Sequence, residues 1–234
     1  MKYNEIISII SKNLEQVLSN RREDVELLSQ LIYALEKIVK SIFNEDVKEK
    51  FEYLIWNKVI TSLLRNSLLY LLLCNYIAVI SSLKLALETS LVFLYVKEKI
   101  MKEKDHEEII EFIRKRSRGG KVFTLKMVKQ IPGIPGPYRT RIVNVYVKLS
   151  YLHHPTHKVF SNVEYLIPQY SSNIFDKCIN LLIATYDIIL YILLKYFGDS
   201  VEFKLLQDVQ NLIKEGRIKL KLCSRKVFKL LRGL

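Results

Sequence analysis

Three of the chain's four histidines, His153, His154 and His157, lie within one short segment, Tyr146–His157. An imidazole has an ordinary pKa of about 6.5 and exchanges protons near neutral pH, so the cluster suits general acid and base catalysis. His153 and His157 have the spacing of a metal-binding pair, but Pro155 interrupts a helix between them and no carboxylate or cysteine is near in sequence. We therefore expect no metal site and no cofactor. The alternative is that His153 and His154 bond the unpaired carbonyls at a helix end.

A second candidate pair, Lys84 and Glu88, lies one helical turn apart on the most apolar stretch of the chain. Burying a charge is costly unless the charge is paired or hydrogen-bonded, so these side chains need partners. In a functional site, Glu88 meets the histidine cluster or Arg141 across a helical bundle and orients an imidazole. The alternative is an ordinary surface pair that stabilises its helix by roughly a few tenths of a kcal/mol.

Basic residues outnumber acidic ones 37 to 24, which gives a formal charge of +13. Such an excess favours attraction to nucleic acid, anionic lipid or an acidic protein. One basic tract precedes residue 130, and a second follows Lys214. Both can neutralise phosphates without reading a base sequence, although the apolar residues of the second tract equally suit an anionic membrane surface. From the first tract we expect these nucleic-acid-binding residues: Arg114, Lys115, Arg116, Arg118 and Lys121.

Helices are the elements expected to position these side chains. The chain holds 7 Gly and 5 Pro against 50% hydrophobic residues, too few breakers for a many-stranded sheet and too much apolar matter for disorder. Apolar residues recur at spacings of three and four over about residues 3–19, 24–43 and 172–197, so each range predicts a helix. Gly198 is expected to end the last of them in a left-handed conformation.

The longest apolar run, Leu63–Met101, predicts one long buried helix or two helices joined near Asn75 and Ser81. This run is the expected centre of the core. A basic loop with Gly and Pro is expected at 114–137 and a basic C-terminal extension at 214–234. The sequence thus predicts a single all-α domain, a multi-helix bundle with a long buried central helix.

That domain is expected to span residues 1–234 and to be cytoplasmic. The three cysteines are odd in number and far apart, so they predict neither a disulfide framework nor a zinc knuckle, and no signal peptide is visible. The runs Asn66–Leu83 and Ile179–Leu194 approach the length of a membrane span. Polar residues dilute the first, and Asp187 lies near the centre of the second, so a membrane protein is the less favoured interpretation.

The spacing of polar residues resembles that of helical families associated with the HEPN superfamily and abortive-infection proteins. The likeness covers about residues 67–156. Its first part is the segment CNYIAVISSLKLALE, in which Lys84 lies four residues before Glu88. It continues with the pattern RxxxxYxxLSxxxHPT, which is made by Arg141, Tyr146, Leu149, Ser150, His154, Pro155 and Thr156. The resemblance implies a helical bundle, commonly dimeric, that acts as an RNA binder or a metal-independent ribonuclease in defence or toxin systems.

The chain departs from the HEPN active-site motif, in which four to six residues stand between an Arg and a His. Lys148 is five residues before His153, whereas Arg141 is twelve before it. Lysine offers a phosphate a point charge but lacks the two-pronged guanidinium of arginine.

The residues and the resemblance together predict an RNA-binding bundle that self-associates, with metal-independent ribonuclease activity as a further expectation. One polar cleft is expected, with His153, His154, Glu88 and Arg141 as catalytic residues, Lys84 and Lys148 as nucleic-acid-binding residues, and Tyr146 and Ser150 in its lining. The expected partners are RNA and a second copy of the chain. The alternatives are a non-enzymatic helical interaction protein and a peripheral membrane-surface protein.

Overall fold

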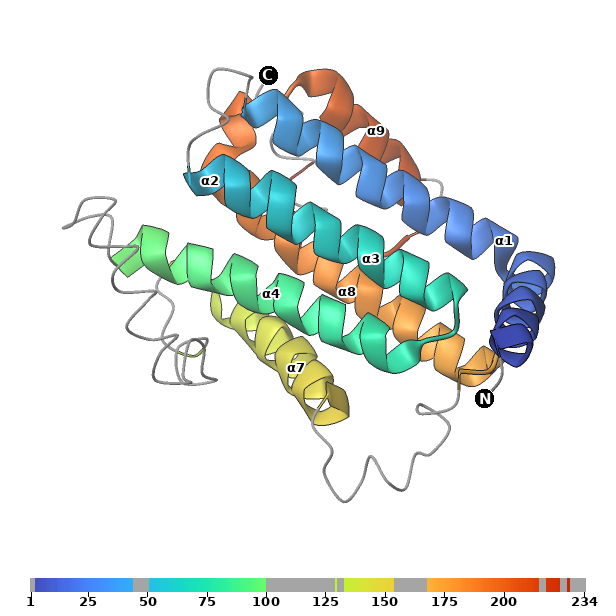
Figure 1. The fold of residues 1–234 in the computed structure, drawn as a ribbon. Helices are drawn as coiled ribbons and strands as arrows, with labels where there is room; N and C mark the ends of the chain where they lie inside the picture. The colour runs from blue at the N-terminus through green and yellow to red at the C-terminus, as the bar shows by residue number, and fades with distance from the viewer. Residues whose placement is uncertain are drawn as a thin grey trace.

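The computed structural model describes residues 3–43, 51–99, 129, 133–153, 168–214, 218–223 and 227. Every regular element among these residues is a helix, so the all-α prediction is confirmed (Figure 1). The following predicted site residues lie outside the described ranges: Arg114, Lys115, Arg116, Arg118, Lys121 and His154.

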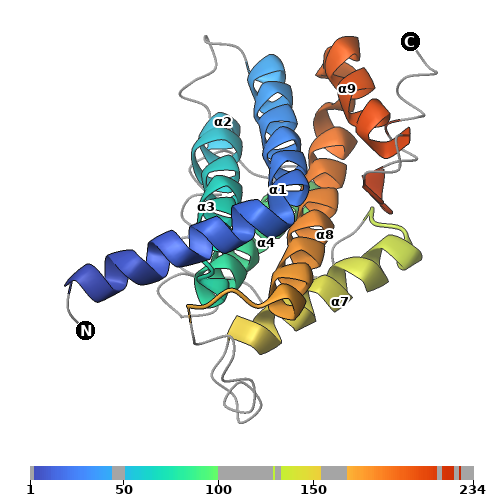
Figure 2. The ribbon, with the colours of Figure 1, turned by 90° about the vertical axis from the view of Figure 1, so that its right-hand side faces the viewer.

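Helix α1 (Tyr3–Ile42) is the longest described element, and it corrects the prediction of two separate helices at 3–19 and 24–43. The backbone leaves the helical conformation at Arg21 alone, with φ −137° and ψ 22°. No proline or glycine stands between the two predicted segments, so the helix resumes at once after this kink. Figure 2 shows the first half of α1 extending from the side of the bundle, whereas the second half packs along it.

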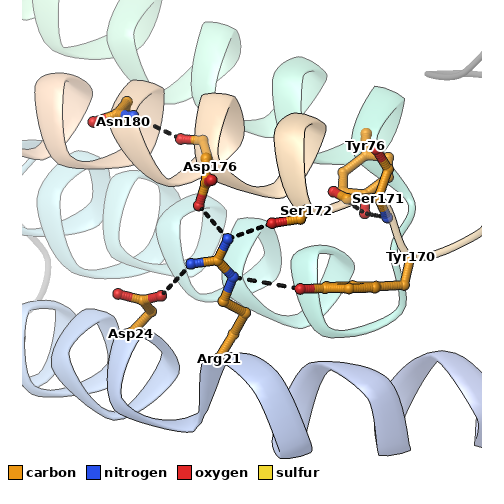
Figure 3. Close-up of polar contacts among 8 residues, drawn as sticks. All are labelled: Arg21, Asp24, Tyr76, Tyr170, Ser171, Ser172, Asp176 and Asn180. Atoms are coloured by element: carbon orange, nitrogen blue, oxygen red, sulfur yellow. Dashed lines mark hydrogen bonds and ion pairs between the residues drawn. The ribbon is translucent and has the colours of Figure 1, made fainter.

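The kink at Arg21 is fixed by polar contacts to the start of another helix (Figure 3). The guanidinium forms an ion pair of 2.8 Å with Asp176 and donates a hydrogen bond of 2.6 Å to the hydroxyl of Ser172. Its Nε donates to the hydroxyl of Tyr170 at 3.4 Å, and a longer ion pair of 3.5 Å joins Arg21 to Asp24. The kink therefore lies where α1 crosses the segment that leads into α8.

Of the two arrangements predicted for Leu63–Met101, one long helix or two, the structure has two helices that meet near Asn75, and the second runs unbroken through Ser81. Helix α2 (Phe51–Tyr53) continues through a π-helical segment (Leu54–Ile60) into α3 (Thr61–Leu72), and α4 (Tyr76–Lys99) begins after a short turn. In the turn, Cys74 has a φ of +54°, and the Asn75 side chain accepts a hydrogen bond of 3.2 Å from the amide of Ala78. An asparagine at this position caps the first turn of the following helix, which explains the break in an otherwise apolar run.

Three further helices complete the described fold: α7 (Gly136–His153), α8 (Ser172–Phe197) and α9 (Phe203–Lys214). The bounds predicted for α8 are confirmed, but the predicted left-handed end at Gly198 is wrong. Gly198 has φ −58° and ψ −34°, and its amide bonds the carbonyl of Leu194. The chain therefore continues through a short 3₁₀ segment, Gly198–Ser200, before α9 begins.

Helix α8 lies at the centre of the bundle. All of its residues from Thr185 to Leu194 are buried, and α4 packs on α8, α7 and α3. Aromatic side chains from different helical segments pack edge to face in the core. Trp56, on the π-helical segment, and Phe93, on α4, have ring centroids 5.3 Å apart. The predicted multi-helix bundle is thus confirmed, and its core has two long apolar helices, α4 and α8.

Those two helices are also long and apolar enough to cross a membrane, by length and composition. The apolar segments are Tyr76–Glu98 and Ser172–Ser200, each with a mean hydropathy of 1.8. In an 18-residue apolar stretch of each segment, 61% and 72% of the residues, respectively, are buried inside the bundle. Helices at the centre of a protein core have the same composition. A cytoplasmic location stays a prediction.

Candidate functional site

A groove of about 910 Å³ lies between α7 and the first half of α8. This volume is at the upper end of the range that holds small molecules, roughly 300 to 1,000 Å³. Its apolar floor and rim come from Pro137, Val145, Val147, Leu152, Leu181 and Ala184. Its polar lining residues are Thr140, Arg141, Asn144, Lys148, Tyr151, Lys177 and Asn180.

The charged residues that line this α7–α8 groove are all basic: Arg141, Lys148 and Lys177. Lys148 and Lys177 are exposed, so their ammonium groups remain hydrated and available to a ligand. Asp176 precedes Lys177, but its carboxylate is engaged by Arg21 on the other side of α8. The lining is therefore cationic and suits a ligand that carries several negative charges.

Arg141 is paired with the buried carboxylate of Asp187. Its Nε lies 3.6 Å from Oδ2 of Asp187, an ion pair longer than a hydrogen bond, and Asp187 is fully buried in α8. The same carboxylate accepts hydrogen bonds from the backbone amides of Leu222, at 2.9 Å, and Cys223, at 3.0 Å. Asp187 therefore joins one wall of the groove to the segment that follows α9.

A separate group of polar side chains, the α4–α7 polar cluster, lies on the other side of α7. The hydroxyl of Tyr146 donates a hydrogen bond of 3.3 Å to Glu88, and Lys84 forms an ion pair of 3.8 Å with the same carboxylate. Burial is the main cause that raises the pKa of Tyr146, and the nearby Glu88 carboxylate raises it further. Tyr146 therefore stays protonated near neutral pH and acts as a hydrogen-bond donor to Glu88. The hydroxyl of Ser150 is buried one turn after Tyr146.

His153 contacts α4 at a separate point, on the same face of α7 as Tyr146. Its Nδ1 lies 3.0 Å from the hydroxyl of Ser81, and that hydroxyl donates to the carbonyl of Ile77 at 2.8 Å. A serine hydroxyl has one proton, so when Ser81 donates it to Ile77 the contact with His153 is made by a proton on Nδ1. In the neutral imidazole this leaves Nε2 as the basic nitrogen, which is the arrangement a general base needs.

The two groups occupy different faces of α7, in place of the single polar cleft expected from the sequence. Arg141 and Lys148 are seven residues apart and share the face toward α8, whereas Tyr146 and His153, also seven apart, share the face toward α4. Positions 141 and 146 differ by five residues, which turns an α-helix by about 140°. The structure therefore brings Glu88, Lys84 and Tyr146 together and gives Arg141 a different partner, Asp187.

Sequence reasoning missed Lys177, Asn180 and Asp187. Lys177 and Asn180 lie on the exposed side of a helix predicted only as core. Asp187 was weighed only as a cost of membrane insertion. A lone carboxylate in the middle of the most apolar helix requires a cation or several hydrogen-bond donors as partners. That requirement is the feature of the sequence that marks Asp187 as a candidate site residue.

Within the described ranges, no group of three or more His, Cys, Asp or Glu side chains is arranged to hold a metal ion. Comparison with known proteins gave no match: no family model, curated protein or solved structure is significantly similar to this chain. Its function must therefore be argued from the groove and the polar cluster themselves.

Proposed function

We propose that the protein binds single-stranded RNA in the α7–α8 groove. The observation that carries the proposal is the lining itself, where three basic side chains, Arg141, Lys148 and Lys177, stand without an acidic residue among the lining residues described. Phosphate contacts by lysine and arginine supply most of the affinity of proteins that bind nucleic acid without sequence preference.

Three other lining residues add contacts that a nucleic acid uses and a simple anion does not. Tyr151 is 39% exposed, enough for its ring to receive a stacked base, and unpaired bases of RNA stack on such rings. Asn144 and Asn180 carry amides that both donate and accept hydrogen bonds with base edges. A HEPN-like, RNA-directed role in defence is part of the same proposal, and the formal charge of +13 supports it.

The test is fluorescence anisotropy with a labelled single-stranded RNA, titrated at several salt concentrations. Lys148→Ala and Lys177→Ala are the best variants, because both side chains are exposed and removing them leaves the core intact. Each should weaken binding and lower the slope of log K against log salt by about 0.7, the value for one lost phosphate contact on a single strand. Arg141 is a poor target, since it also compensates the buried Asp187.

Matched controls are Lys58→Ala, on the π-helical segment, and Lys204→Ala, on α9, which remove the same charge from exposed positions outside the groove. Both should leave the salt slope unchanged. If the wild-type protein does not bind RNA, or if the controls weaken binding as much as the groove variants do, the groove is not an RNA site. A non-enzymatic interaction protein would then be the better interpretation.

RNA cleavage is a second candidate function, supported by the position of His153. This histidine ends α7 on the face toward α4, where its Nδ1 lies 3.0 Å from the hydroxyl of Ser81. Lys84 and Glu88 lie three and seven residues after Ser81 on the same helix. In this proposal His153 takes the proton of the ribose 2′-hydroxyl, whose oxygen forms a bond to the adjacent phosphorus while the bond from phosphorus to the 5′ oxygen breaks. The leaving 5′ oxygen takes a proton from the protonated His153 or from water, and a basic residue stabilises the charged phosphate.

Cleavage is tested by incubating wild-type protein and His153→Asn with RNA in the presence of a chelator, which a metal-independent reaction tolerates. The variant should lose about a hundredfold in rate or more, the usual contribution of a general acid or base. It should keep its RNA affinity and its melting temperature, because His153 is exposed. Equal cleavage by both proteins would assign the activity to a contaminant or to other residues.

A further inference from the structure

The first half of α1 carries a row of exposed apolar side chains. We call residues 4–20 the arm and this row the exposed stripe. Its members and their exposed fractions are Ile6 38%, Ile7 44%, Ile10 36%, Leu14 37% and Leu18 46%. Figure 2 shows the arm reaching away from the bundle, with its N-terminal end farthest out. Apolar surface gathered in this way on one helix indicates an interaction surface rather than scattered exposure.

The arm is nevertheless held in a fixed orientation by residues at one edge of the stripe. Asn13 and Val17 are buried against the bundle. The amide group of Asn13 donates to the carbonyl of Pro168 at 2.6 Å and accepts from the backbone amide of Tyr170 at 3.2 Å. The exposed stripe is therefore presented by an anchored helix, so an interaction there does not first have to order the helix.

The spacing of the stripe indicates that its partner is another helix. Ile7, Ile10 and Leu14 follow one another at three and four residues, the spacing of the seam along which two helices pack side by side. Ile6 and Leu18 widen the stripe on either side of that seam. Asn4 and Ser11, which flank it, are uncharged.

Charge separates a protein partner from an anionic surface. The arm contains Glu5, Lys12 and Glu15, which give it a net charge of −1 in a chain of +13. At 100° per residue, Glu5 and Lys12 fall on the face opposite the stripe. An anionic membrane or a nucleic acid has no basic residue to contact along the stripe. Two basic copies of the chain, however, meet there with the least repulsion.

We propose that two copies of this chain pair through their arms, with one exposed stripe against the other around a twofold axis. A twofold interface must be complementary to itself, and a stripe without charges meets this condition in either helix orientation. From Ile6 to Leu18 the stripe is only about 18 Å long, so the contact is small and the dimer should dissociate on dilution. This inference names a surface for the expected homodimer and does not depend on RNA binding.

Sedimentation velocity over about a hundredfold range of protein concentration measures this equilibrium. The wild-type protein should shift from monomer to dimer as the concentration rises. Ile10→Lys places a charge in the middle of the stripe and should weaken the dimer at least tenfold. Two matched controls introduce the same charge at other exposed positions: Ser8→Lys, on another side of the arm, and Leu85→Lys, on α4. Both should dimerise like the wild type.

Cysteine cross-linking gives a second, position-specific readout. The three native cysteines are all buried, so an introduced thiol on the arm is the exposed one. Under mild oxidation, Ile10→Cys should form a disulfide-linked dimer, because position 10 lies near the middle of the stripe, and Ser8→Cys should not. A wild-type protein that stays monomeric at every concentration, or controls as defective as Ile10→Lys, would overturn the proposal.

Lipid is the competing occupant and has its own test. Vesicles of phosphatidylcholine with phosphatidylserine are sedimented with the wild-type protein and with Ile10→Lys. The dimer proposal expects no difference between the two proteins. Loss of vesicle binding in Ile10→Lys, with a wild-type protein that is monomeric in solution, would assign the stripe to a membrane surface and overturn the dimer.

Discussion

Oδ2 of Asp187 lies 3.6 Å from Nε of Arg141, in the interior of the bundle, while both oxygens of the same carboxylate accept hydrogen bonds from backbone amides. One buried acid thus compensates an arginine of the α7–α8 groove and anchors the segment after α9. Both the position of Arg141 in the groove and the packing of the C-terminal segment against the core depend on this carboxylate.

Replacing Asp187 should therefore destabilise the protein strongly. Asp187→Ala leaves two buried amides without their acceptor and Arg141 without its counter-charge, and breaking a buried pair in this way costs about 3 to 5 kcal/mol. Urea denaturation measures the loss, and amide exchange at Leu222 and Cys223 should speed up at the same time. The control, Asp208→Ala, removes an exposed carboxylate from α9 and should change little. A cost under about 1 kcal/mol for Asp187→Ala would contradict this assignment.

Two glycines at the start of α7, Gly133 before the helix and Gly136 as its first residue, should respond in opposite ways to alanine. Gly133 has a φ of +71°, and a Cβ there would stand 2.7 Å from Nζ of Lys195 and 2.8 Å from a carboxylate oxygen of Glu98. Gly133→Ala should cost about 1 to 2 kcal/mol for the left-handed backbone, and more if the ion pair of Lys195 and Glu98 must move. Gly136→Ala meets nothing within 4 Å and should be neutral or stabilising by up to about 1 kcal/mol. Equal melting temperatures for both variants would contradict the backbone cost assigned to Gly133.

The three thiols should be unreactive in the folded protein. Cys74, Cys178 and Cys223 are buried, and burial raises the pKa of Cys178 to about 12 and that of Cys223 well above its usual value. Because the thiolate is the reactive species, a disulfide reagent at pH 8 should label the native protein only as fast as it opens. Full labelling should follow denaturation. A thiol that reacts within seconds in the native state would show that its segment is exposed in solution.

Stability should fall in alkaline solution. Burial is the main cause that raises the pKa of Tyr76, Tyr146 and Tyr186, whereas in the unfolded chain a tyrosine titrates near pH 10. Above that pH the native state binds more protons than the unfolded state, so the free energy of unfolding decreases as the pH rises through 10 and is unaffected by these groups below about pH 9.

Urea titrations between about pH 8 and pH 11 measure this effect. Tyr146→Phe removes one such group and should make the alkaline decline shallower, by at most about 1.4 kcal/mol per pH unit. A free energy of unfolding that stays constant up to pH 11 would mean that these hydroxyls ionise as easily in the folded protein as in the unfolded chain.

Most of the helical fold could be predicted from the spacing of apolar residues, but the continuity of α1 could not. The stripes at 3–19 and 24–43 are out of phase, and the sequence alone cannot show that one kinked residue, Arg21, absorbs the difference by binding α8. Gly198 likewise has the residue type of a left-handed helix end, yet its backbone is free to continue into a 3₁₀ turn. Such local choices depend on contacts that form only in the bundle.

The candidate site shows the same limit more sharply. The sequence identified Arg141, Tyr146 and His153 as candidate site residues of one cleft. The turn of 100° per residue in an α-helix nevertheless places Arg141 on a different face of the helix from the other two. The sequence could not give their partners, since Asp187, Ser81 and Lys177 lie on other helices and carry no motif. Those partners follow from how α7 lies against α4 and α8, which is a property of packing and not of spacing.

The anchoring of Leu222 by Asp187 also has a consequence for how the chain is made. Leu222 is 35 residues farther along the chain, so α8 leaves the ribosome before the amides that complete the surroundings of its carboxylate. A chain interrupted before Leu222 lacks the two amide donors to this buried carboxylate and keeps only the longer contact with Arg141, so its core is less stable and more open to proteases and chaperones.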